Sequence, residues 1–146
     1  MADPRKAVSF SGIGREVVTF LAGGAGAAQI TYSATAEGGS AAVGKAVTLS
    51  AAGTVALAAD GESVIGKLVR VESDGVCAVQ VAGFMTLPGG NGAALTLGKA
   101  IVGAADAGGA PGCVREVNTG VAAELGRSRG YIVDAGTPAA TVVKLP

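Results

Sequence analysis

The sequence predicts an all-β fold, a small β-sandwich or barrel of short antiparallel strands with an extended N-terminal arm. Runs rich in Val, Ile, Leu and Thr recur along the 146 residues. Gly, Asp-Gly or Asn-Gly separates one run from the next, as the turns of an all-β domain require. Within several runs large apolar residues alternate with small or polar ones, as at Val79 and Val81. This alternation indicates strands with one buried face.

Ten strands are expected in chain order, each a short apolar run bounded by turn-forming residues. They cover residues 16–21, 29–33, 45–49, 54–58, 64–72, 77–86, 95–102, 113–117, 131–134 and 141–145. Tight turns, in which glycine tolerates positive φ, are expected at Asp60-Gly61, Asp74-Gly75 and Asn91-Gly92. One short helix is expected within residues 118–127, with Asn118 or Thr119 as its N-cap.

The composition argues against several classes of function. The chain carries 11 basic and 11 acidic side chains, and this balance gives no electrostatic attraction for nucleic acid or an anionic membrane. It has no His, the side chain most often used for acid–base catalysis and metal binding. Cys77 and Cys113 form no C-x-x-C pair, so buried free thiols in a reducing compartment are expected. We therefore expect no enzyme activity, no cofactor and no metal site.

The acidic residues are expected to be solvated surface charges, because all stand at turns or beside basic residues. Those that could suggest a catalytic acid pair are Glu62, Glu72, Asp74, Glu116, Glu124 and Asp134. The aspartates of the Asp-Gly turns lack the surrounding D-x-D-x-D-G pattern of a calcium loop. We expect no calcium site at these turns.

The glycine-rich stretch VVTFLAGGAGAA, residues 17–28, could suggest a nucleotide-binding loop. A dinucleotide fingerprint needs a third Gly or Ala followed by a helix whose N-terminus meets the pyrophosphate. Here Gln29 stands at that position, and residues 30–33 alternate like a strand. No Gly-Lys-Ser/Thr is present to make a Walker loop. The stretch is expected to be a flexible connector.

The N-terminus, MADPRKAVSF, lacks the apolar segment of a signal peptide, and no run of 18 apolar residues occurs in the chain. A soluble protein made in the cytosol is expected. Aromatic residues make up only 3% of the chain, and 25 residues are Gly. Small side chains bury little apolar surface, and Gly raises the entropy cost of folding. We expect association with other subunits to supply part of the missing burial.

Four triplets consist of an apolar residue, Gly and a basic residue: Val43-Gly44-Lys45, Ile65-Gly66-Lys67, Leu97-Gly98-Lys99 and Leu125-Gly126-Arg127. Their spacing suggests two related halves joined near residues 88–92. A Gly within a strand marks a bulge or bend, and a neighbouring cation protects an exposed edge from stray pairing. The alternative is that the four cations line a binding surface.

Residues 1–40 differ from residues 41–146, which form the expected β-rich domain. The first forty combine a charged start with scattered large apolar residues and then mostly small ones. Apolar side chains are costly to leave in water, so we expect this arm to dock on a neighbouring subunit. The expected contact residues are Arg5, Phe10, Ile13, Val17 and Phe20.

The body of the chain resembles the small capsid cement, or head decoration, proteins of tailed bacteriophages. The resemblance rests on VGKAVTLSAAGTVALAADGESVIGKLVRVESDGVCAVQVAGF, on LTLGKAIVG and on a hydrophobic C-terminal strand, and it covers about residues 41–146. It implies a non-enzymatic β-rich protein of the virion, commonly a homotrimer, attached to the outside of the expanded head. The implied partners are the major capsid protein and further copies of the chain, with neither nucleic acid nor membrane.

Two other functions stay open from the sequence. GRSRGYIVDAG, residues 126–136, resembles the Arg-Ser-Gly phosphate motif of trimeric dUTPases, although Arg129 follows Ser128 here and no matching Asp and Tyr pair is found. A phage tail or receptor-binding module is the third possibility. Such a module usually offers aromatic platforms for sugars, whereas this chain has two Tyr, three Phe and no Trp.

Overall fold

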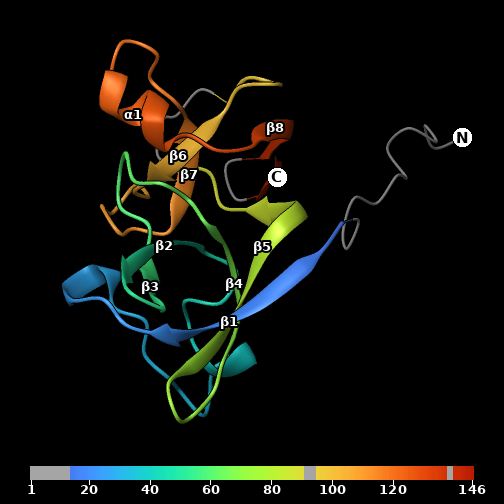
Figure 1. Cartoon of the computed structure of the whole chain (residues 1–146). Coiled ribbons are helices and arrows are strands. Elements are labelled where there is room, and N and C mark those ends of the chain that lie inside the picture. Colours follow the sequence, from blue (N-terminus) through green and yellow to red (C-terminus); the bar gives the residue numbers. More distant parts are fainter. Residues whose placement is uncertain (1–13, 91–94, 138–139) are drawn as a thin grey trace, which may run out of the picture.

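The computed structural model describes residues 14–90, 95–137 and 140–146, and it confirms the all-β prediction. Nine strands, two 3₁₀ turns and one short helix follow one another within these residues (Figure 1). In chain order they are β1 (Glu16–Ala22), η2 (Gly26–Ala28), η3 (Glu37–Gly39), β2 (Ala46–Ala51), β3 (Thr54–Leu57), β4 (Gly66–Val71), β5 (Val76–Leu87), β6 (Ile101–Ala104), β7 (Cys113–Glu116), α1 (Ala122–Arg127), β8 (Tyr131–Thr137) and β9 (Ala140–Leu145).

Five strands close into a barrel. Their order is β1-β3-β2-β4-β5, and β1 pairs with β5 to complete the circle. All of these pairings are antiparallel except the short parallel pairing of β1 with β3. A small closed barrel leaves few unpaired strand edges. The chain thereby protects most of its short strands from pairing with other molecules.

A second group of strands continues from the barrel through β5. The first part of this 12-residue strand pairs with β1 and β4, whereas residues Gly83–Leu87 pair with β9. β9 in turn pairs with β8, and β6 and β7 form a separate two-stranded sheet. Figure 1 shows this second group together with α1 at one end of the molecule, beyond the barrel.

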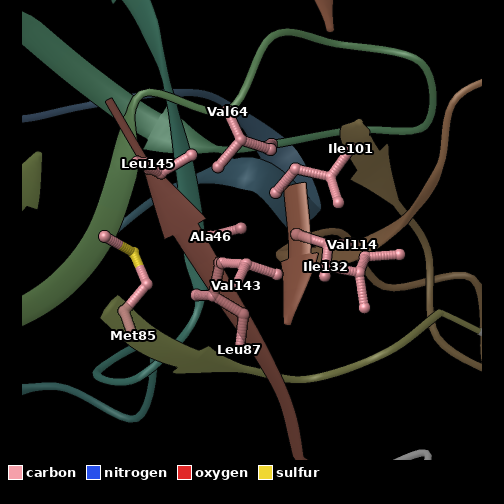
Figure 2. Close-up of a cluster of buried hydrophobic side chains, with 10 residues drawn as sticks. Ala46, Val64, Met85, Leu87, Ile101, Val114, Ile132, Val143 and Leu145 are labelled. Atoms are coloured by element: carbon pink, nitrogen blue, oxygen red, sulfur yellow. The ribbon is translucent and has the colours of Figure 1, made fainter. Parts of the chain in front are cut away.

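Two apolar clusters form the core. The barrel cluster contains Ile30, Ala42, Val47, Val55, Leu57, Leu68, Val71, Cys77 and Val79. The second cluster, shown in Figure 2, contains Ala46, Ala58, Val64, Met85, Leu87, Ile101, Val114, Ile132, Val143 and Leu145. Adjacent residues contribute to different clusters because successive side chains of a strand point to opposite faces. The Ala46-Val47 and Leu57-Ala58 pairs thus join the two clusters through β2 and β3.

Two glycines are required where backbones approach closely. A Cβ on Gly66 of β4 would collide with the backbone carbonyl of Gln80, and one on Gly103 of β6 would collide with that of Ala59. Gly103 also donates a backbone hydrogen bond to the Glu62 carbonyl, at 2.8 Å. Gly66 therefore lets β4 lie close to β5 within the barrel, and Gly103 lets β6 of the second group lie directly against the loop after β3.

One predicted strand is wrong, and another, residues 95–102, is wrong from residue 95 to residue 100. Residues 29–33 form no strand; the Ile30 N–H donates to the Gly23 carbonyl, which folds this segment back on the end of β1 and places Ile30 in the barrel cluster. Residues 95–100 are also not a strand, because Gly98 adopts a φ of 79° in a turn, and β6 begins only at Ile101. In residues 29–33 local alternation was present without a strand partner, whereas residues 98 and 99 do exchange hydrogen bonds with Ile132 but turn at Gly98.

Several other local predictions are confirmed. The expected helix is present as α1, but the prediction of Asn118 or Thr119 as its N-cap is wrong, because the helix begins later and its N-cap is Val121, which makes no side-chain cap hydrogen bond. Cys77 and Cys113 are buried free thiols. Asp60-Gly61 and Asp74-Gly75 form turns in which both glycines have positive φ. The predicted turn at Asn91-Gly92 lies outside the described residues. No helix in the described part of the chain has the length and apolar character needed to cross a membrane.

Candidate docking surface

β1 contains two of the predicted contact residues, Val17 and Phe20, and is built into the barrel. It pairs with β5 from Glu16 to Leu21, but it reaches β3 only at Leu21 and Ala22. Among the described residues, most of β1 therefore has a strand partner on one edge only. The other predicted contact residues, Arg5, Phe10 and Ile13, lie outside the described residues.

The direction of the backbone groups follows from two hydrogen bonds. The Leu21 N–H donates to the Gly53 carbonyl beside β3, at 2.9 Å, whereas the Ala22 N–H donates to the Gly75 carbonyl beside β5, at 2.8 Å. Backbone groups alternate between the two edges of a strand. The groups of Val17 and Thr19 therefore face the same edge as those of Leu21, and no described strand pairs with them there. We call this stretch the open edge of β1.

The side chains of β1 are also unusually accessible. Val17 is 44% exposed and Leu21 53% exposed, and Val18 is exposed as well. Phe20 is half-buried and packs against the barrel cluster. The two predicted contact residues therefore have different environments. Val17 is available to a partner, whereas Phe20 contributes mainly to the barrel.

β5 and β4 continue the surface beside β1. Val17 lies opposite Gln80, and Gln80 lies opposite Lys67. The buried Gln80 amide is fixed by donating to the Ala82 and Phe84 carbonyls, at 3.2 and 3.1 Å. Burial lowers the pKa of Lys67, and the nearby positive charge of Arg15 lowers it further. This face therefore carries the fixed Gln80 amide and the positive charges of Lys67 and Arg15 beside Val17.

The four Gly-basic triplets occupy different settings. Gly44 and Gly98 lie in turns with positive φ, Gly66 lies in β4, and Gly126 lies in α1. Of the cations that follow them, Lys45 and Lys67 are half-buried, whereas Lys99 and Arg127 are exposed. The similarity of the triplets in sequence does not correspond to one shared backbone conformation.

Arg115 of β7 organises an ion-pair cluster that the sequence did not predict. Its guanidinium contacts Asp60 in the loop after β3, at 2.8 Å, and Glu124 in α1, at 2.6 Å. Glu124 also accepts the Asn118 N–H, at 3.0 Å. These contacts lower the pKa of Glu124 to about 2, chiefly through the hydrogen bond from Arg115. The cluster fastens α1 to the rest of the molecule.

The prediction that Glu124 is a solvated surface charge is therefore wrong. Its side chain is only 13% exposed, because α1 folds over Arg115. The residues involved are far apart in sequence, and no local pattern marks their contact. Glu72 and Asp74 are exposed as expected; Glu72 pairs with Arg70, and Asp74 accepts the Val76 N–H in the turn before β5.

The remaining polar features have structural partners. The side chain of Asp106 accepts the Gly108 and Ala110 N–H groups, which lower its pKa and fix the loop between β6 and β7. Burial raises the pKa of both cysteine thiols. In residues 126–136 the chain leaves α1, turns at Gly130 and enters β8. Within the described ranges, no group of three or more His, Cys, Asp or Glu residues could hold a metal.

Two shallow cavities flank η3. One, of about 260 Å³, lies between the segment from Tyr32 to Gly39 and the end of β4. The other, of about 440 Å³, lies between η3 and Val43 and Val69. Their charged lining residues are Arg70 and Glu72, which pair with each other, and Glu37. The cavities do not gather a set of groups suited to catalysis.

Comparison of this chain with protein-family models, with curated proteins and with solved structures finds no match.

Proposed function

We propose that the protein decorates the outside of a bacteriophage head, where it binds the major capsid protein and holds neighbouring capsid subunits together. The observation that carries this proposal is β1, whose open edge and exposed apolar side chains lie on an otherwise closed barrel. The resemblance of residues 41–146 to capsid cement proteins gives the kind of partner. Neither feature requires catalysis, cofactor or metal.

The open edge supports binding by strand addition. Backbone N–H and C=O groups that face outward can pair with an extended segment of another protein. Val17 and Leu21 would add apolar contact beside that pairing, because burial of an exposed Val or Leu contributes about 1.5–3 kcal/mol. The barrel holds β1 in an extended conformation before binding, which lowers the entropy cost of association.

The protein is also proposed to assemble with itself, as a homotrimer, on the virion surface. Many copies on one shell would turn weak individual contacts into strong attachment through multivalency. The small residues that dominate the composition limit the apolar burial available to one subunit. Association between copies would supply additional burial.

Co-sedimentation with expanded, DNA-free heads of the phage that encodes the protein tests the proposal. We expect the purified chain to pellet with heads and to reach saturation. The double substitution Val17→Asp and Leu21→Asp should weaken binding about tenfold or more, because it places charges in an apolar contact. A matched control is Leu49→Asp, which changes an exposed leucine of β2.

Light scattering on the same samples gives the oligomeric state. Circular dichroism should show that all variants keep the β fold, since Val17, Leu21 and Leu49 are exposed. A chain that stayed in the supernatant at every head concentration would refute the proposed function. Binding of the Val17 and Leu21 variant at wild-type strength would refute the role of β1.

A further inference from the structure

We infer that a second docking surface lies at the end of the molecule formed by α1, β8 and residues 97–99, and that it binds an acidic segment of the major capsid protein. This inference rests on the proposed function and deepens it. The surface combines exposed apolar side chains with cations that have no carboxylate partner in the described residues. It is separate from β1, which lies in the barrel (Figure 1).

Hydrogen bonds bring these segments together. The Gly98 N–H donates to the Ile132 carbonyl at 2.8 Å, and the Ile132 N–H donates to the Lys99 carbonyl at 2.9 Å. Arg129 and Ile101 form an isolated antiparallel bridge. Only residues 128–130 separate α1 from β8. Residues 97–99, the end of α1 and the start of β8 therefore form one surface.

Exposed apolar side chains are concentrated here. Leu97 is 65% exposed, the largest value among the exposed large apolar side chains of the described residues. Tyr131 of β8, Leu125 of α1 and Val121 just before α1 are exposed as well. Exposed apolar residues that gather in one area, and are not scattered singly, mark an interaction surface.

The same area presents positive charge. Lys99, Arg127 and Arg129 have no carboxylate within ion-pair distance among the described residues. Lys144, opposite Tyr131 on β9, donates to the Leu145 carbonyl. Lys99, Arg127 and Arg129 each stand two residues from an exposed apolar residue, namely Leu97, Leu125 and Tyr131.

The nearby carboxylates already have ion-pair or hydrogen-bond partners within the protein. Glu124 and Asp60 bind Arg115. Glu116 accepts the Thr96 N–H, at 3.0 Å, and Asp134 accepts the Gly136 N–H, at 2.9 Å. The complementary partner is therefore a protein segment that carries both acidic and apolar side chains.

Two separate docking surfaces on one folded body would allow a single subunit to bridge two capsid subunits. β1 would pair with one, and the α1 end would bind the acidic segment of its neighbour. A bridging contact of this kind explains how a small protein stabilises a shell: separation of the two capsid subunits would break one of the two contacts.

Head binding by the double variant Lys99→Glu and Arg127→Glu tests the inference, with Arg70→Glu on β4, an exposed cation that pairs with Glu72, as the control outside this surface. We expect the double variant to bind heads about tenfold more weakly, since each exposed charge contact contributes modestly and reversal adds repulsion. Wild-type binding should weaken with added salt, and the double variant should show a smaller salt dependence. Wild-type affinity and salt dependence in the double variant would overturn the inference.

Peptide binding separates this inference from the proposed function. Fluorescence anisotropy is measured with labelled peptides that alternate Glu with Leu, and with peptides that carry Lys in place of Glu. We expect the wild-type protein to prefer the acidic peptide and the double variant to lose that preference. If the wild-type protein does not bind heads but still prefers the acidic peptide, the proposed function is wrong and the acidic-binding surface is supported. Equal binding of both peptides, or stronger binding of a single-stranded oligonucleotide than of the acidic peptide, would overturn the inference.

Discussion

β1 and β8 stand at the two ends of the seven-stranded order, and their edges differ. The start of the outer edge of β8 is covered by residues 98–101, which exchange hydrogen bonds with Ile132 and with Arg129 just before the strand. Along β1, Val17 and Thr19 face an edge without a described partner. Ile132 of β8 is almost fully buried, whereas Val17 is exposed. β8 thus buries Ile132 in the second cluster, although its Tyr131 is exposed, whereas β1 exposes Val17, Val18 and Leu21.

The largest expected effect comes from truncating a buried residue of β8. Ile132→Ala should lower the free energy of unfolding by about 2–5 kcal/mol, because it opens a cavity in the second cluster. Val17→Ala should change it by at most about 0.5 kcal/mol, as is usual for an exposed position. Urea unfolding followed by circular dichroism measures both. Equal losses would show that β1 and β8 contribute alike to folding.

Proline substitutions in β1 give the next largest effect and test the direction of its backbone groups. Val18→Pro removes an N–H that faces β5 and leaves its acceptor without a donor, which should cost about 1–3 kcal/mol of stability. Thr19→Pro removes an N–H that faces the open edge, so its cost should be about 1 kcal/mol or less. Thermal unfolding compares the two variants. If Thr19→Pro were the more damaging, the assignment of the open edge would be wrong.

A smaller effect is expected in the Arg115 cluster. Arg115→Met removes both ion pairs and leaves Glu124 mostly buried without its main partner. We expect the free energy of unfolding to fall by about 1–3 kcal/mol, the range for a buried polar group that loses its hydrogen bond. Chemical denaturation at neutral pH measures the change. The double variant Arg115→Met and Glu124→Gln should recover part of the loss; no recovery would argue against the cluster.

The smallest effect is a dependence on pH. The pKa of Glu124 is about 2 in the folded protein, below its ordinary value of 4.5. A lowered pKa adds stability that is complete above the ordinary value and is lost as the pH falls toward 2. The stability difference between wild type and Glu124→Gln should therefore shrink as the pH falls from 4.5 to about 2. A difference that stayed constant over this range would contradict the assignment.

The sequence predicted the fold class because strand alternation and turn residues are local signals. β2, β3 and β7 and the turns at Gly61 and Gly75 follow such signals closely. Local alternation failed in residues 29–33, because a strand also needs a partner, and the partner is set by the tertiary fold. The closure of the barrel by β1 and β5 depends on residues about sixty positions apart, which no local pattern specifies.

The candidate site was predictable only in part. Scattered apolar residues near the N-terminus drew attention to Val17 and Phe20, yet the exposure of Val17 and the packing of Phe20 against the barrel cluster depend on pairing with β5. The triplet pattern included Lys99 and Arg127 among possible binding cations. It did not indicate that they would lie beside Leu97 and Tyr131, since β8 and residues 97–99 meet only through tertiary hydrogen bonds.

Electron cryo-microscopy of expanded heads, prepared with and without the purified protein, tests the central claim most directly. We expect additional density on the outer surface, over the junctions between capsid subunits, with β1 against the shell. Two identical reconstructions at saturating protein concentration would contradict a role in capsid decoration.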